Sequence, residues 1–477
     1  MPTPADLTAI VPELVLVLTA GIVLLVEAFL ERYRGVIAPV ALVATAAAAW
    51  TRLVLPLPGR CWSGMLSIDA TASFVDLTIL GALFLSIMIT APFFRRLGRD
   101  RGEPYALLLL AATGAMVMAS STDLLVIFLG LELLSIPLYV LNASLKDVEI
   151  SLEAGLKYFV VGAFAAGFTV YGIALLYGAT GTTNLASMAG IFPGRVPLLL
   201  LGFAMVLGGF AFKLALFPFH GWAPDVYQGG PTPVTAFLSV VPKAAALVVV
   251  LRLVGTVKPG SISNHWLLAG ALVAVVSQAL GNIVAIVQRD IKRMLAYSGI
   301  AHMGYAFVGI LAGGPDGRRA VLVYLAAYTL MNVGAFAAVA LLSEKEDQPH
   351  LINDLAGQGW KRPVVSLALA VCMFSLAGVP PFVGFMGKFL VFGAAVNHDL
   401  VWLAVIGVIA SLVSAFYYLR VVYFLYMKPL PRREPEFAPS PALVWTAALA
   451  AGLVVAVGVF PQPLIRAATE AARMLGG

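Results

Sequence analysis

The sequence predicts an all-α, polytopic membrane protein with about 14 transmembrane helices. Of its 477 residues, 61% are hydrophobic and only 11% are charged, whereas soluble domains carry roughly 25% charged residues. Apolar stretches long enough to cross a hydrocarbon core of about 30 Å recur along nearly the whole chain, with short polar breaks between them. A soluble fold has too little interior to hide so much apolar surface.

The predicted helices follow the apolar runs between charged or Pro/Gly-rich breaks. They fall near residues 7–30, 36–55, 70–93, 105–120, 122–142, 154–177, 196–217, 235–254, 266–288, 294–312, 319–343, 363–396, 402–427 and 441–461. The first run lacks a basic leader and a small-residue cleavage motif, so we expect it to be retained as a helix. An even number of crossings leaves both termini on one side of the membrane.

Basic residues in the loops predict which side this is, because cytoplasmic loops are enriched in Lys and Arg. One alternating set of loops is richer in them and includes Arg95, Arg96, Arg99, Arg101, Arg289, Lys292, Arg293, Lys428, Arg432 and Arg433. We therefore expect both termini outside. The net charge of +6 is interpreted as this topology signal, and no nucleic-acid partner is expected.

Two predicted helices are broken, at residues 217–222 and 378–385, and the breaks share a Pro-Phe-x-Gly-aromatic pattern. Proline and glycine leave backbone N–H and C=O groups without hydrogen bonds, and lipid cannot supply partners for these groups. Such breaks therefore belong beside protein or water. Together with a weak echo between the helices near 154–177 and 319–343, they predict an inverted repeat of the kind found in transporters.

The predicted organisation has four parts. Residues 1–104 hold helices 1–3, and residues 105–254 form a first five-helix repeat of helices 4–8. Residues 266–427 form the second, inverted repeat of helices 9–13, because an odd number of helices turns the second copy upside down. Residues 428–477 contain helix 14.

Four ionisable residues inside predicted helices are the candidate catalytic residues of a proton relay: Glu132, Lys213, Lys243 and Lys388. A charge in the hydrocarbon region is costly and usually functional. Desolvation disfavours a charged lysine and a nearby carboxylate favours it, so small movements can load or release a proton. The alternatives are a structural ion pair for Glu132 and snorkelling to the interface for Lys213 and Lys243.

Weaker relay candidates are His220, His302 and Lys157. An imidazole titrates near neutrality and suits a relay, although a lone histidine on a helix is as often simply packed. Structural roles are expected for Glu13, Asp69 and Asp76, and an ion-pair or interfacial role for Arg420. The loop histidines His265, His350 and His398 are given no role.

Motifs for other chemistry are missing from the sequence. It contains no phosphate-binding GxxxxGKS loop, no GxGxxG after a strand, and no metal-ligand spacing of His and Cys. The two cysteines, Cys61 and Cys372, are far apart and form no CxxC or CxxH pattern. We therefore expect no cofactor-binding site, no metal site and no redox centre in this chain.

The string FPFHGWAPDVYQGGPTPVT at 217–235, between Lys213 and Pro242-Lys243, resembles a known family. This family contains the antiporter-like membrane subunits of respiratory complex I, the proton-translocating NADH-quinone oxidoreductase. The resemblance covers most of the chain and implies a translocase subunit of the bacterial inner membrane. It implies an ion pair between Glu132 and Lys213, a central relay by Lys243, and proton exit at Lys388.

The resemblance also implies what lies outside the chain. Quinone reduction elsewhere in the complex would drive the protons, and NADH, FMN, iron–sulfur clusters and quinone would be bound by other subunits. The expected partners are an antiporter-like neighbour, small membrane subunits and the lipid bilayer. The alternatives are a subunit of an Mrp-type sodium/proton antiporter or a membrane-bound hydrogenase, and a structural tethering subunit with static ion pairs.

Overall fold

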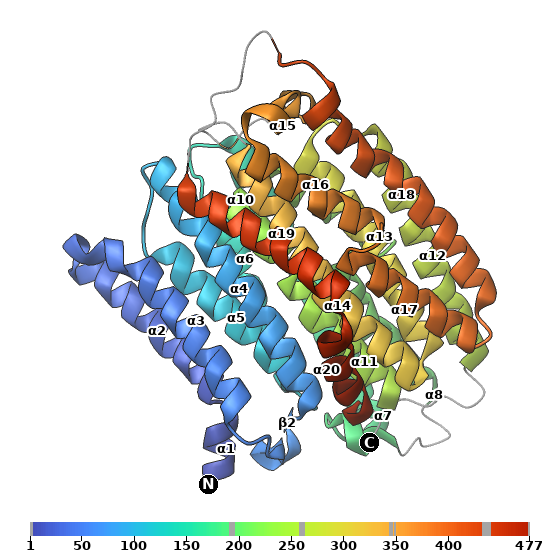
Figure 1. Ribbon diagram of the computed structural model, residues 1–477. Coiled ribbons are helices and arrows are strands. Elements are labelled where there is room, and N and C mark those ends of the chain that lie inside the picture. Colours follow the sequence, from blue (N-terminus) through green and yellow to red (C-terminus); the bar gives the residue numbers. More distant parts are fainter. Residues whose placement is uncertain are drawn as a thin grey trace.

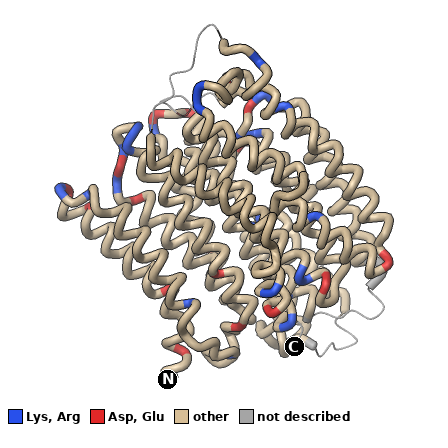
Figure 2. The backbone as a smooth tube through the Cα atoms, viewed as in Figure 1, with Lys and Arg blue, Asp and Glu red and all other residues tan. Residues whose placement is uncertain are grey.

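The computed structural model describes residues 3–189, 196–256, 263–342, 347, 350–431 and 440–475. It is a bundle of long helices with both ends of the chain at the same end of the bundle (Figure 1). Charged residues gather at the two ends of the bundle, and an almost uncharged band separates them (Figure 2). This distribution matches a bilayer, which accepts charge readily only at its surfaces.

The N-terminal part contains three long helices and a small β-hairpin. Its elements are α1 (Pro4–Ala9), α2 (Val11–Phe29), η1 (Glu31–Val36), α3 (Ile37–Val54), β1 (Gly59–Cys61), η2 (Trp62–Gly64), β2 (Leu66–Ile68) and α4 (Ala70–Arg96). Strands β1 and β2 pair antiparallel, with Arg60 opposite Ser67. Asp69 begins α4, because its carboxylate accepts the backbone N–H of Ala72 at 2.8 Å.

The middle of the chain contains two groups of helices. The first comprises α5 (Glu103–Ser120), α6 (Leu124–Asn142), α7 (Glu149–Thr180), η3 (Leu185–Ala189), α8 (Val196–Leu214), α9 (Trp222–Gly229), α10 (Thr232–Leu238) and α11 (Val241–Thr256). The second comprises α12 (Ser263–Val287), α13 (Ile291–Ala312), α14 (Gly314–Leu341), η5 (Ile352–Leu355), α15 (Gln358–Lys361), α16 (Pro363–Ala377), α17 (Val383–Asn397) and α18 (Val401–Met427). Each group has a broken helix, and the inverted relation between the groups stays a prediction.

The predicted all-α membrane fold is confirmed. Within the described residues, 13 helical segments are long and apolar enough to cross a membrane, and α16 and α17 are shorter apolar helices. The predicted breaks are present: α8 ends at Leu214 before the short α9, and α16 ends at Gly378 in a left-handed conformation with φ of 89°. Glycine accepts this conformation without the strain that a side chain would add.

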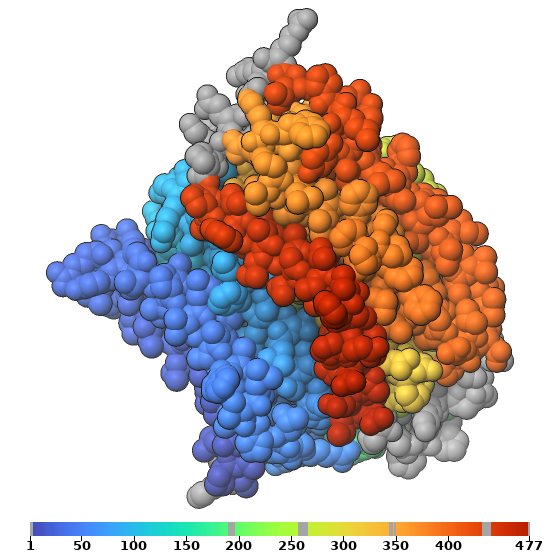
Figure 3. Space-filling view, viewed as in Figure 1, coloured from blue at the N-terminus to red at the C-terminus, as the bar shows by residue number. Residues whose placement is uncertain are grey.

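The structure adds three features to the predicted helices. The eighth helix begins at Thr232, close to the predicted start at 235, and is interrupted between α10 and α11, at Ser239 and Val240. The short α1 and the β-hairpin were not expected. The C-terminal crossing α19 (Pro441–Val459) continues after Pro461 as an amphipathic helix α20 (Gln462–Met474), whose buried alanines contact α4 and α14. Figure 3 shows this C-terminal segment in red, lying across one face of the molecule.

Candidate proton pathway

Glu132 lies in the middle of α6 and is half-buried, with the exposed side chains of Leu129 and Leu133 beside it. Its helix starts at Asp123, whose carboxylate accepts the backbone N–H of Leu125 at 2.9 Å. Within the part of the chain that the structure describes, the carboxylate of Glu132 has no ion pair within 4.0 Å. It is therefore held at the edge of the bundle within a span that must cross the bilayer.

Lys213 lies in the last turn of α8, directly before the break. Its Nζ is 3.4 Å from the hydroxyl of Tyr158, and it faces the rings of Tyr158, Tyr139 and Phe212 at 5.1, 5.4 and 5.7 Å from their centroids. Aromatic faces attract a desolvated cation by up to about 2 kcal/mol. This ring of aromatic side chains holds the ammonium group away from water.

The expected ion pair between Glu132 and Lys213 is not closed in this structure, because no carboxylate oxygen of the described residues lies within 4.0 Å of Lys213 Nζ. The two charges still lie near enough to interact electrostatically. The physical reason is that the aromatic rings and the Tyr158 hydroxyl occupy the sides of the ammonium group. The pair is therefore separated rather than locked, contrary to a static structural ion pair.

Lys243 lies in the first turn of α11, just after the interruption at Ser239 and Val240. Its Nζ is 3.4 Å from the hydroxyl of Tyr328 on α14, and it faces the ring of Tyr227 at 5.5 Å. Lys243 is 1% exposed, compared with 3% for Lys213 and 4% for Lys388. All three ammonium groups are therefore too deep for snorkelling to the interface, and that alternative is wrong.

His302 on α13 packs against two tyrosines that contact the lysines: Tyr305, at 5.7 Å between ring centroids, faces Lys388, and Tyr328 contacts Lys243. Its Nδ1 is 2.7 Å from the hydroxyl of Tyr324, and its Nε2 is 3.0 Å from the hydroxyl of Tyr418. Its ring also lies 5.2 Å from that of Tyr328, which contacts Lys243. The structure thus brings together Lys243 and the weaker candidate His302.

Lys388 on α17 reaches back across the break to the end of α16. Its Nζ donates to the backbone carbonyls of Leu376 and Ala377, both at 2.9 Å, and to the hydroxyl of Ser411 at 2.8 Å. The carbonyl end of a helix carries partial negative charge and favours a cation. The ring of Tyr305, whose hydroxyl accepts from Asn282 at 2.8 Å, faces the same ammonium at 5.2 Å.

Two of the weaker candidates do not join this line. Lys157 is 44% exposed and pairs with Glu153 at 2.6 Å and Asp225 at 2.9 Å, so its long side chain has reached the end of the bundle. His220 is half-buried in the break after α8, where its ring stacks on Phe217 at 5.9 Å. Neither side chain contacts any of the three buried lysines.

The sequence analysis missed the tyrosines of the pathway. Seven of the largest fully buried side chains are Tyr158, Tyr227, Tyr305, Tyr324, Tyr328, Tyr417 and Tyr418. A hydroxyl inside a membrane span needs a partner, so tyrosine among small apolar residues was the available signal. Asn332, which donates to Ser239 at 2.6 Å beside the α10–α11 interruption, was missed as well.

Several charged residues outside the pathway have structural contacts. Arg420 was expected as an ion-pair or interfacial partner, and it donates to the carbonyls of Ile286 and Gln288, both at 2.6 Å, at the end of α12. His350, for which no functional role is expected, is buried and has structural contacts: its Nε2 lies 2.9 Å from Asp347 Oδ1 and 3.4 Å from the hydroxyl of Thr232. Its sequence neighbours do not reveal this burial.

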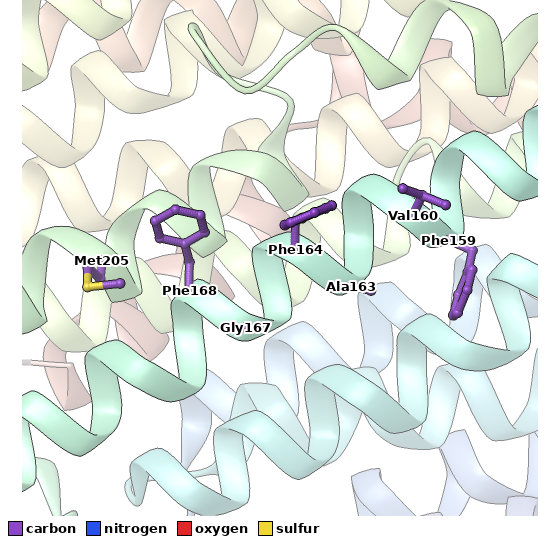
Figure 4. A pocket seen from close by; sticks show the side chains of 7 residues that line it. All are labelled: Phe159, Val160, Ala163, Phe164, Gly167, Phe168 and Met205. Atoms are coloured by element: carbon purple, nitrogen blue, oxygen red, sulfur yellow. The ribbon is translucent and has the colours of Figure 1, made fainter.

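The described residues offer no group of three or more metal-ligating side chains. A large groove of about 540 Å³ lies on α7 and α8 and is lined by Phe159, Val160, Ala163, Phe164, Gly167, Phe168 and Met205 (Figure 4). These side chains carry no titratable group, and three of the phenylalanines are more than half exposed. The groove therefore offers no side chain that could carry a proton.

A helical bundle with lysines buried at two helix breaks defines an antiporter-like membrane subunit. The family described as NADH:quinone oxidoreductase/Mrp antiporter matches residues 121–414, and the chain belongs to this family. It is 40% identical to subunit N of the NADH-quinone oxidoreductase of Trichlorobacter lovleyi, with 98% of each chain covered.

Two solved structures share the fold. A chain of respiratory complex I from Thermus thermophilus is 33% identical and superposes with a TM-score of 0.81, over 95% of this chain and 98% of that chain. A chain of the Mrp complex from Dietzia sp. superposes with a TM-score of 0.83 over 98% of both chains. The latter is 22% identical, so it shows a common fold alone.

Proposed function

We propose that this chain is the N-type membrane subunit of a proton-pumping NADH-quinone oxidoreductase, and that Glu132, Lys213, Lys243 and Lys388 carry its protons in that order. The observation that supports it is three lysine ammonium groups, each 4% exposed or less, that have aromatic, hydroxyl or carbonyl partners instead of carboxylates within 4.0 Å. A permanently paired charge has little reason to exchange its proton. A lysine without a fixed counter-charge responds strongly when one approaches.

Glu132 and Lys213 form the switch in this proposal. Two unit charges 4 Å apart interact by about 4 kcal/mol at an effective dielectric constant of 20. Approach of Glu132 to Lys213 favours the protonated amine, and separation favours release of its proton. A change of about 1.4 kcal/mol in this interaction alters the proton affinity of Lys213 tenfold. Closure of the gap between Glu132 and Lys213 is therefore enough to make the lysine bind or release its proton.

From Lys213 the proton passes to Lys243, and His302 shortens the next step to Lys388. The imidazole lies beside Tyr328 on the Lys243 side and has hydrogen-bonding hydroxyls at both ring nitrogens. It can accept a proton at one nitrogen and donate from the other. Lys388 then releases the proton at the second helix break, which we expect to face the exit side.

The surroundings of the chain follow from the same proposal. The chain lies in the bacterial inner membrane with both termini outside, beside an antiporter-like subunit and small membrane subunits. NADH, FMN, iron–sulfur clusters and quinone are bound by other chains, whose redox reaction moves Glu132 relative to Lys213. The 40% identity to an NADH-quinone oxidoreductase subunit favours this over an Mrp-type antiporter or a membrane-bound hydrogenase.

The test is the number of protons pumped per NADH oxidised by the complex in reconstituted vesicles. Lys243→Met should lower this ratio while the complex still assembles. Lys157→Met is the matched control, because that lysine is exposed and lies outside the line. An unchanged ratio in Lys243→Met would favour the structural tether, and sodium-dependent proton movement without NADH would favour the antiporter.

A further inference from the structure

Three charged side chains meet inside the N-terminal helices, outside both five-helix groups. Arg52 from α3 contacts Glu13 from α2 at 2.7 Å and Asp76 from α4 at 2.8 Å. The side chains of Arg52, Glu13 and Asp76 are 3%, 6% and 0% exposed, respectively. The cluster lies in spans that are apolar enough to cross a membrane. It ties the α2–α3 pair to α4.

The charges of this cluster do not balance. Arg52 keeps its proton under all ordinary conditions. If Glu13 and Asp76 were both ionised, two negative charges would face one positive charge and the cluster would hold a net charge of −1. An uncompensated buried charge costs several kcal/mol even after relaxation of the protein. One further positive charge is needed to make the site neutral.

No neighbouring cation among the described residues supplies that charge. Arg252 on α11 already faces Asp69 at 3.4 Å and the carbonyl of Ala119 at 3.2 Å. The other ionisable groups that interact with the cluster are the acid Asp69 and the buried thiol of Cys61, and neither carries positive charge. Arg60 on β1 is exposed.

Three carboxyl oxygen atoms of the cluster have no hydrogen-bond partner among the described residues. They are Glu13 Oε2, Asp76 Oδ1 and Asp76 Oδ2, and all three are fully buried. Glu13 Oε1 and Asp76 Oδ2 lie at ion-pair distance from the same atom, Nη2 of Arg52. The two carboxyl groups are thus neighbours, and a protonated carboxyl would add the missing O–H donor.

We propose that Glu13 and Asp76 share one proton beside Arg52, which makes the N-terminal helices a proton-binding site separate from the lysine pathway. The proton makes the cluster neutral, because one carboxylate pairs with the guanidinium and the other group is a carboxylic acid. Two carboxyl groups that compete for one counter-charge titrate together, so the proton is bound by Glu13 and Asp76 as a pair and not by either residue alone. This site stands whether or not the buried lysines form a relay.

Infrared spectroscopy of the purified, intact complex tests the proposal, because the C=O stretching band of a carboxylic acid differs from that of a carboxylate. At neutral pH, Glu13→Gln and Asp76→Asn should each lose the band of one carboxylic acid, since the remaining carboxylate then pairs with Arg52 alone. The double variant should also lose one band and not two. Glu31→Gln is the control, because Glu31 is 73% exposed and should contribute no such band.

The remaining outcomes contradict the proposal. If neither single variant loses a carboxylic acid band, both groups are ionised in the unaltered complex. If only one variant loses the band, the two groups do not share a proton. A band in the unaltered complex that disappears when sodium is added assigns the site to a metal cation instead of a proton. If the double variant fails to assemble because Arg52 is unpaired, the two single variants decide the question, since each keeps one ion pair.

Discussion

Gly299 on α13 provides the space that the ammonium group of Lys243 occupies. A methyl group at position 299 would lie 2.7 Å from Lys243 Nζ and 2.9 Å from the hydroxyl of Tyr328. Such distances are shorter than van der Waals contact. Because Nζ is the far end of a flexible side chain, the lysine would move and the helices would stay. The position of the central relay residue thus depends on a missing side chain on a neighbouring helix.

Gly299→Ala should therefore lower proton pumping without loss of assembly. Displacement of Lys243 breaks its hydrogen bond to Tyr328, and hydrogen bonds to charged groups are worth roughly 1.5–3 kcal/mol. This predicts a reduction of about tenfold or more in pumping rate. Gly393→Ala is the control, since a methyl group there meets nothing within 4 Å. Equal rates in both variants, measured in vesicles, would contradict the assigned position of Lys243.

Tyr158→Phe and Tyr158→Leu should separate the two ways in which Tyr158 holds Lys213. The first removes the hydroxyl at 3.4 Å and keeps the ring, whereas the second removes both. The ring interaction contributes up to about 2 kcal/mol for a desolvated cation. We expect a small loss of pumping for phenylalanine and a larger one for leucine. The reverse order in the same vesicle assay would show that the ring is unimportant.

Ser411→Ala should weaken proton release at Lys388 less than Lys388→Met does. The serine supplies one of three acceptors, and the carbonyls of Leu376 and Ala377 remain. Methionine removes the ammonium group itself and leaves both carbonyls without their donor. The measurement is the ratio of protons pumped to NADH oxidised. A larger loss in Ser411→Ala than in Lys388→Met would be incompatible with Lys388 as the exit residue.

Asp347→Asn should destabilise the opposite end of the bundle from the termini. Burial raises the pKa of the Asp347 carboxyl, but Lys292 and His350 outweigh it and hold the pKa well below its ordinary value. A carboxyl whose pKa is depressed by folding stabilises the fold at pH values above its pKa in the unfolded chain, about 3.9. This stabilisation is lost as the pH falls below that pKa. The contribution is therefore complete and constant between about pH 5 and 8.

Asp347→Asn should lower the free energy of unfolding by about 3–5 kcal/mol, because asparagine leaves buried Lys292 without its counter-charge. Thermal unfolding of the complex measures this loss. Asp399→Asn is the matched control: Asp399 is exposed, and both aspartates have a positive φ, 58° and 60°, which asparagine accepts. Similar shifts in both variants would indicate a backbone effect instead of a lost ion pair.

Hydropathy and Pro/Gly breaks were enough to predict most of the fold. Long apolar runs leave a helix as the only structure that satisfies the backbone in lipid, so the number of crossings and both breaks follow from the sequence. The amphipathic α20 was missed because it lacks such a run. The interruption before Lys243 was missed although Pro242 marks it, because this residue has no N–H to donate to the carbonyl of Leu238.

The candidate site was predictable only in part. Burial of Lys213, Lys243 and Lys388 followed from their apolar neighbours, and their depth is confirmed. The state of the Glu132–Lys213 pair depends on how α6 and α8 are rotated against each other, which the sequence of each helix does not reveal. The buried tyrosines were overlooked because tyrosine is equally common at membrane interfaces, where its hydroxyl meets water.

The three acceptors around Lys388 match the three N–H donors of a protonated lysine. A neutral amine has two donors and one acceptor, so after departure of the proton its two N–H groups can still serve the two carbonyls, and the Ser411 hydroxyl can donate to its nitrogen. The two carbonyls are the last of α16 before Gly378, and Ser411 belongs to α18. The direction of the hydrogen bond between Lys388 and Ser411 therefore depends on whether the lysine holds its proton.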